Sequence, residues 1–164
     1  YPNYGVALLL KEEATGKIFL QRVKITGSNA KPRILEIFKD EVIGLPGIPT
    51  VSALPLNGPE YMFFAVDKNV YCLDLNNITK PVTLYKSFDA NVVAMNAESE
   101  TYSCAHMAVG LENGEFYILM IYGAKNLSEE EKVIYPKHGA AYPAEERMGR
   151  IVDIKYKQLD HWNY

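Results

Sequence analysis

The sequence predicts an all-β fold of the β-propeller type, in which four-stranded antiparallel sheets repeat along the chain. Three observations predict it. Short apolar strands fill almost the whole sequence, three hairpin signals recur along it, and several strands are apolar on both faces instead of alternating with polar residues. A propeller sheet is packed between two neighbouring sheets, so its middle strands bury both faces. The pattern therefore favours stacked sheets over one half-exposed sheet.

The hairpins are the strongest local signals. Gly16 ends the first turn, where a residue without a side chain tolerates positive φ. Asn113 and Gly114 form the third turn, and this dipeptide between two apolar strands is the clearest short-range hairpin signal. The expected hairpins join residues 6–10 to 17–25, residues 61–66 to 70–75, and residues 107–112 to 115–122.

Each hairpin is followed by two further short strands. The third strands end alike, with an aromatic residue after an aliphatic one. They are expected at residues 33–38, 82–88 and 132–135, and the fourth strands at residues 50–56, 92–96 and 150–157. The hairpins begin at residues 6, 61 and about 106, a spacing close to that of propeller blades. We expect one domain over residues 1–164, made of units at about 5–56, 57–97 and 104–157.

Three units do not close a ring easily, because natural propellers use about four to eight blades. The last strand, residues 150–157, then either serves as the inner strand of another blade or returns to pair beside residues 6–10. Open sheet edges need a cover. The remaining partners are further blades of the same polypeptide, upstream of Tyr1, or self-association, and the sequence favours the former.

Composition excludes some classes of function. Hydrophobic residues make up 48% of the 164 residues and charged residues 23%, as in an ordinary globular domain. A net charge of −3, without a cluster of Lys and Arg, argues against nucleic-acid binding. The longest apolar run, Phe116 to Tyr122, is too short for a transmembrane helix. Because the chain starts at Tyr1 without Met, we expect a processed product or part of a longer polypeptide, with any targeting signal upstream.

No motif for a metal, a cofactor or nucleophilic catalysis stands out. His106, His138 and His161 are too far apart for a zinc motif. Neither a Gly-x-Ser-x-Gly elbow nor a glycine-rich phosphate loop occurs. Cys72 and Cys104 are expected to be buried thiols or, alternatively, one bridge between neighbouring strands. Cys104 and His106 share a strand face, but an ordinary strand start explains them better than a catalytic pair.

Acidic residues do not mark a glycosidase site. Such a site needs two carboxylates across a cleft. The candidates are Asp67, Glu112, Asp153 and the pair Glu145 and Glu146, and nothing in the sequence brings two of the separate positions together. We interpret each of them as a solvated loop or edge residue, and we expect no catalytic residue.

Aromatic residues are the one enriched class with binding potential, with twelve Tyr, six Phe and one Trp. Most lie on strands and are expected in the core. Tyr135, Tyr142 and Trp162, with Tyr164, lie in or after the long insertion at residues 123–149. Exposed Tyr and Trp can stack on sugar rings or dock a partner. Tyr135, Tyr142 and Trp162 are therefore the candidate ligand-binding residues, with simple packing as the alternative.

Three segments resemble the C-terminal propeller-like region of PKD-like family lipoproteins, bacterial surface proteins often associated with outer-membrane glycan-uptake systems. The segments are YMFFAVDKNVYCLDL at 61–75, MAVGLENGEFYIL at 107–119 and GRIVDIKY at 149–156. The family's lipid-anchoring Cys and its PKD-like domains have no counterpart here, as would follow for a C-terminal part.

The resemblance implies a non-enzymatic binding or assembly module at the cell surface, with glycans or outer-membrane uptake proteins as partners. It provides no catalytic residues. The alternatives are a fragment of a polysaccharide-cleaving propeller and a protein-interaction scaffold. Clustered carboxylates at the mouth of the ring would favour the enzyme. An exposed aromatic platform would favour glycan binding, and a flat apolar patch would favour a protein partner.

Overall fold

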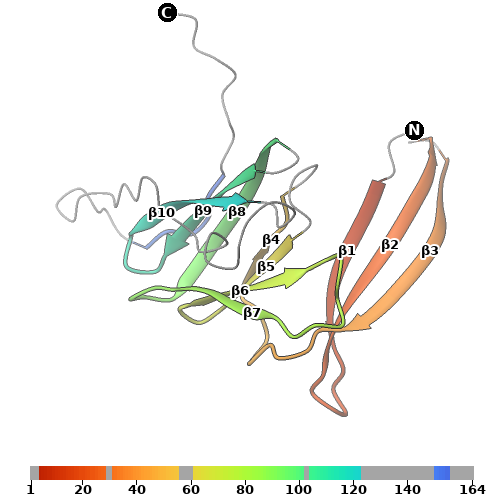
Figure 1. The fold of residues 1–164 in the computed structure, drawn as a ribbon, viewed down its shortest axis with the longest axis horizontal. Helices are drawn as coiled ribbons and strands as arrows, with labels where there is room; N and C mark the ends of the chain where they lie inside the picture. The colour runs from red at the N-terminus through yellow and green to blue at the C-terminus, as the bar shows by residue number, and fades with distance from the viewer. Residues whose placement is uncertain (1–3, 29–30, 56–60, 102–103, 123–149, 156–164) are drawn as a thin grey trace, which may run out of the picture. The chain divides into compact units, whose positions relative to one another are not determined.

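The computed structural model describes residues 4–28, 31–55, 61–101, 104–122 and 150–155, and these residues form an all-β fold (Figure 1). They contain no helix, and so no helix that could cross a membrane. The all-β prediction is confirmed. The strands are β1 (Tyr4–Lys11), β2 (Ile18–Ser28), β3 (Lys31–Glu41), β4 (Val51–Ala53), β5 (Tyr61–Val66), β6 (Asn69–Asp74), β7 (Thr83–Ser87), β8 (Val92–Thr101), β9 (Cys104–Leu111) and β10 (Phe116–Tyr122).

The chain divides into two compact units. The first comprises Tyr1–Ile48 with Asn77–Val82, and the second comprises Pro49–Asn76 with Thr83–Tyr164. Each is described by itself below. The single domain expected over residues 1–164 stays a prediction.

The first unit contains one antiparallel sheet in the order β1-β2-β3 (Figure 1). Lys11 pairs with Ile18 at the turn end of the first hairpin, and Gly16 within the turn has a φ of 71°. The hairpin and the third strand lie where the sequence predicts them, although the strands are longer. Leu20 on the central strand is fully buried.

The second unit contains two antiparallel sheets, one in the order β4-β5-β6-β7 and one in the order β10-β9-β8. Both predicted hairpins of this unit are confirmed. Their turns use positive φ at Asp67, 52°, and at Gly114, 87°. Asp tolerates this left-handed region better than most residues with side chains, and Gly enters it without a steric cost.

The strands group into sheets differently from the predicted units. β4 was expected to end the first unit and β8 to end the second, but β4 pairs with β5 and β8 pairs with β9. Each sheet of the second unit therefore begins with the strand that precedes its predicted hairpin, which has three residues in β4 and ten in β8. In both places the strand joins the sheet of the hairpin that follows it and not the sheet of the hairpin that precedes it. The predicted strand at residues 132–135 lies outside the described residues.

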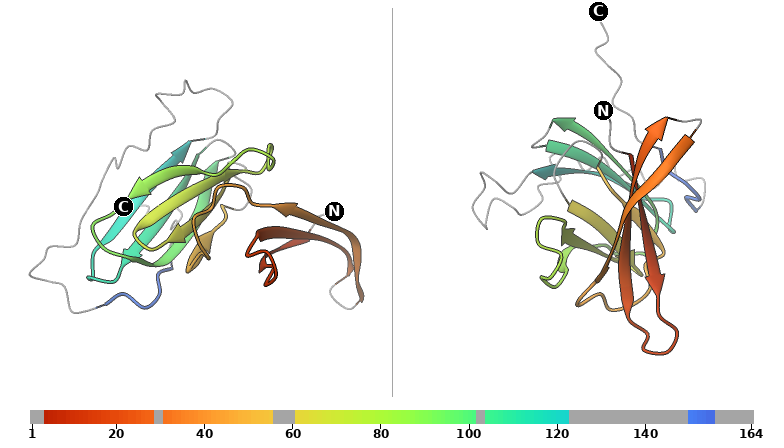
Figure 2. Two further views of the ribbon diagram at one scale, coloured as in Figure 1. Left: turned by 90° about the horizontal axis from the view of Figure 1, so that it is seen from below. Right: turned by 90° about the vertical axis from the view of Figure 1, so that its right-hand side faces the viewer.

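The core of the second unit lies between its two sheets (Figure 2). Phe63, Ala65 and Val70 of one sheet belong to the same buried cluster as Met107 and Val109 of the other. Alternate residues of a strand point to opposite faces, and Met62 and Phe64, on the other face of β5, are buried as well. The expectation that a middle strand is buried on both faces is met at β5.

The same backbone hydrogen bond occurs in both units, and it shows which residues of the two sheets are equivalent. The Val42 N–H, just after β3, donates to the Ile18 oxygen at 2.8 Å, and the Phe88 N–H, just after β7, donates to the Lys68 oxygen at 2.9 Å. This contact makes β1, β2 and β3 equivalent to β5, β6 and β7. In this alignment Leu20 corresponds to Val70, and both are fully buried.

Candidate functional site

The aromatic residues predicted to bind a ligand cannot be placed. Tyr135, Tyr142 and Trp162 lie outside the described residues, as does Tyr164. Their role stays a prediction.

The histidines and carboxylates do not form a metal site within the described ranges, where no three potential ligands gather. His106 lies on β9 opposite Glu98 of β8, while His138 and His161 fall outside those ranges. Asp67 and Glu112 both lie in hairpin turns and are exposed, as predicted.

The structure does bring these two turns to the same connection between β7 and β8. The Asp67 backbone oxygen accepts from the Val92 N–H at 2.8 Å, and the Glu112 N–H donates to the Asn91 oxygen at 2.9 Å. Both bonds use the main chain. The contacts therefore account for the position of the turns and do not identify a catalytic pair.

Cys72 is a free, largely buried thiol on β6 and not half of a disulfide. Burial raises its pKa to about 12, and the negative charge of Asp74 acts in the same direction. Since the thiolate is the nucleophile, this side chain is unreactive at neutral pH. Burial also raises the pKa of Tyr85, whose ring packs edge-on against Phe63 at a centroid distance of 4.8 Å. Cys72 and Tyr85 are therefore core residues.

The sheet of the first unit exposes large apolar side chains on one face, which sequence reasoning did not single out. The strand pairing places Leu8, Leu10, Phe19, Val23 and Ile37 on this face, called here the Leu8 face, together with Gln21, Lys39 and Glu41. The Lys39 ammonium lies over the Phe19 ring, 4.1 Å from its centroid. Leu8 is 43% exposed and Ile37 58%. The positions equivalent to Leu8 and Val23 in the second unit are Phe64 and Leu73, which are exposed by 0% and 1%.

The opposite face carries Arg22, a cation with only some of its hydrogen-bond donors paired. Arg22 on β2 pairs with Asp40 at 2.9 Å and lies over the Phe38 ring, with its guanidinium carbon 5.4 Å from the centroid. Its Nε atom is buried and has no acceptor among the described residues. A buried donor without an acceptor is unfavourable and uncommon.

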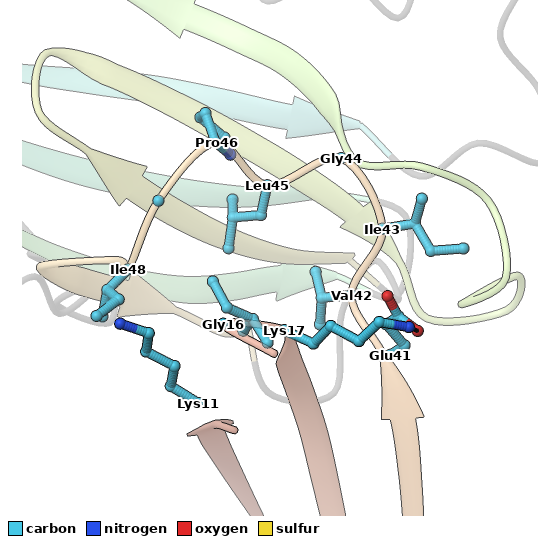
Figure 3. A pocket seen from close by; sticks show the side chains of 12 residues that line it. Lys11, Gly16, Lys17, Glu41, Val42, Ile43, Gly44, Leu45, Pro46 and Ile48 are labelled. Carbon is cyan, nitrogen blue, oxygen red and sulfur yellow. Dashed lines mark hydrogen bonds and ion pairs between the residues drawn. The ribbon is translucent and has the colours of Figure 1, made fainter. Parts of the chain in front are cut away.

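A hollow of about 450 Å³ lies at the turn end of the same sheet (Figure 3). Its walls combine aliphatic side chains with charged ones, and Lys17 forms an ion pair with Glu41 at 2.8 Å at one side. The hydrogen bond to Glu41 raises the pKa of Lys17. Figure 3 shows the Lys11 ammonium on the other side, beside Ile48. The hollow is lined by Lys11, residues 16–18 and residues 41–48.

The loop of the hollow is shaped by glycine and proline. Gly44 has a φ of 80°, and a Cβ there would lie 3.3 Å from the Cβ of Pro81. The sequence signal was the run GLPGIP at 44–49, which contains two Gly and two Pro. Such a run predicts an irregular loop, but it does not indicate that the loop curves over the end of a sheet.

The segment at residues 150–155 forms no strand, although a strand was predicted over residues 150–157. Ile151 lies against β9 of the second unit, where a Cβ built on Gly110 would come within 2.7 Å of the Ile151 Cγ2. Val152 is 87% exposed. The segment is thus held at Gly110 and lacks a strand partner within the described part of the chain.

Comparison with known proteins identifies no relative: no family model, no curated protein and no solved structure matches this chain.

Proposed function

We propose that this chain is a non-enzymatic binding or assembly module made of propeller-type sheet repeats. The observation that carries the proposal is the exposed Leu8 face. Leu8 and Val23 are apolar at positions where the second unit buries Phe64 and Leu73. An exposed apolar surface of this kind is typical of an interaction site.

The propeller-type arrangement is supported by how the sheets begin and pack. In the second unit each sheet starts with one strand, continues into a hairpin, and packs its face on the other sheet. Blades of a propeller are built from consecutive antiparallel strands and stack in this way. By the same logic, the sheet β1-β2-β3 is a further blade, and no first strand pairs with β1 among the described residues.

The role proposed for the assembled protein follows from the resemblance to PKD-like lipoproteins. It is binding or assembly at the cell surface, with glycans or outer-membrane uptake proteins as partners. The hollow offers charged and aliphatic side chains but no aromatic platform for a sugar ring. It therefore gives the glycan-binding part of the proposal less support than the Leu8 face gives to the assembly part.

The competing function is that of a polysaccharide-cleaving enzyme. Its residues would be carboxylates such as Asp67 and Glu112, whose turns meet at the β7–β8 connection. Both side chains are exposed and belong to turns, whereas a general acid is commonly kept protonated by an apolar or crowded site.

The test compares binding with turnover. The purified protein is applied to a glycan array, and the same glycans are assayed for the release of reducing ends. We expect binding to a glycan without turnover. Turnover that disappears in Asp67→Asn or Glu112→Gln would overturn the proposal. Asp89→Asn, at another exposed position, is the matched control and should change neither readout.

A further inference from the structure

A short aliphatic pattern occurs three times in the sequence. It reads Val-Ser-Ala-Leu from Val51, Val-Val-Ala-Met from Val92 and Ile-Val-Asp-Ile from Ile151. The first two copies lie in or run on from the strands β4 and β8, each of which begins a sheet of the second unit. The third copy is the segment at residues 150–155, which has no strand partner within the described residues. It is equivalent in sequence to a first strand.

The sheet of the first unit has an edge to which no described strand pairs. β1 corresponds to β5, and β4 pairs with β5 at residues 63–65. The equivalent residues of β1 are Ala7 to Leu9. They lie at the edge of the sheet, and no described strand pairs with them on that side. An unpaired edge presents a row of backbone donors and acceptors to an incoming strand.

The side chains of the third copy differ from those of the first two in one informative way. Asp153 stands where the first copy has Ala53, which pairs with Phe63 beside Cys72. In the first unit the residues equivalent to Phe63 and Cys72 are Ala7 and Arg22. An apolar row in one sheet is thus replaced by Asp, Ala and Arg in the other, and the small Ala leaves room for the charged side chains to meet.

Arg22 and Asp153 have the groups that such a contact requires. The Arg22 Nε is buried without an acceptor. Asp153 now pairs with Lys155 at 3.1 Å, where both side chains are well exposed, and its oxygen also accepts from its neighbour's Ile154 N–H at 2.9 Å. An exposed ion pair of this kind contributes little to stability and can be given up for another partner. A carboxylate can accept two hydrogen bonds from one guanidinium group.

We infer that residues 150–155 of one copy of this chain pair with the free edge of β1 in a second copy and place Asp153 beside Arg22. This inference rests on the proposed sheet repeat. A second copy is favoured over the same copy, because the described residues of each chain form three sheets and two chains give six. Six sheets lie within the range that closes a propeller ring, and three do not. The exchange is reciprocal, as in a two-fold dimer.

The test exchanges the two charges. We expect the wild-type protein to sediment as a dimer in analytical ultracentrifugation. Arg22→Asp and Asp153→Arg should each weaken dimerisation by at least about 30-fold, because like charges then meet at both contacts. An equimolar mixture of the two variants should form a heterodimer, since both of its contacts again join Arg to Asp. The double variant should also dimerise.

The controls separate this inference from misfolding and from other sources of the strand. Lys80→Glu reverses an exposed charge elsewhere and should leave the dimer unchanged. Recovery in the mixture excludes misfolding of the single variants. A monomeric wild type, or a mixture that stays monomeric, would overturn the inference, as expected if preceding sequence supplied the missing strand. The proposed function would then still be decided by the assay of binding against turnover.

Discussion

Equivalent positions in the two units have very different surroundings. Phe64 on β5 is fully buried, whereas Leu8 at the equivalent position of β1 is 43% exposed. Both residues are apolar and both lie in hairpins of the same register. The difference teaches that an apolar sequence does not by itself decide whether a strand of this chain is buried.

The largest expected effect tests this difference directly. Phe64→Ala should lower the free energy of unfolding by about 3–5 kcal/mol, because it opens a cavity in a packed core. Leu8→Ala should lower it by less than about 1 kcal/mol in dilute solution, because the side chain is partly in water already. Urea unfolding of both variants at low protein concentration measures the two costs. Equal costs would mean that the Leu8 face is covered in the isolated chain.

A smaller effect is expected at two glycines with different surroundings. Gly110→Ala should destabilise the protein by about 1–2 kcal/mol, because the new methyl group meets Ile151. Ile151→Ala should remove most of that penalty in a double-mutant cycle. Gly16 has open space around it and a φ of 71°, so Gly16→Ala should cost about 1 kcal/mol through backbone strain alone. A penalty at Gly110 that persists without Ile151 would contradict the contact.

Alkaline pH should weaken the second unit through Cys72. The thiol of the unfolded chain loses its proton near pH 9, whereas the folded thiol keeps it up to about pH 12. The unfolded state therefore binds fewer protons in this window, and stability falls as the pH rises from 9 to 12. Cys72→Ala should reduce this fall in unfolding experiments. Mass spectrometry of single peptides should show that Cys72 is alkylated slowly until the protein is denatured.

The smallest effect is expected at the ion pair of the first unit. Lys17 and Glu41 have side chains that are 49% and 40% exposed, and exposed pairs contribute little. The raised pKa of Lys17 means that its contribution is present at neutral pH and is lost as the pH rises above the lysine range. Lys17→Met should barely change the unfolding midpoint, and high salt should remove any change. If Lys17→Met were still clearly less stable than the wild type at high salt, the ion pair would have to be shielded from solvent.

Turn chemistry made the hairpins predictable. Gly16 and Gly114 mark turns because positive φ is easy only without a side chain, and the strands on either side were found as expected. The sheet to which a linking strand belongs was not predictable in this way. The strand at Val51 to Ala53 lies between two hairpins, and its short aliphatic sequence fits the edge of either one.

The other features of the candidate site depend on contacts between distant residues. Arg22 resembles any charged residue that alternates with apolar neighbours in a strand, and only the structure shows its Nε without an acceptor. The hollow depends on how residues 42–48 curve over the turn end of the sheet. A local pattern of glycine and proline predicts a loop there and does not give its path.

The two hairpin turns beside the β7–β8 connection are fixed through main-chain atoms, since the oxygens of Asp67 and Lys68 and the N–H of Glu112 make the bonds. The Glu112 side chain adds one contact, because its carboxylate accepts from the Asn91 N–H at 3.4 Å. Asp67 holds a positive φ of 52°, so Asn or Gly should replace it at little cost, whereas a β-branched residue there should strain the turn.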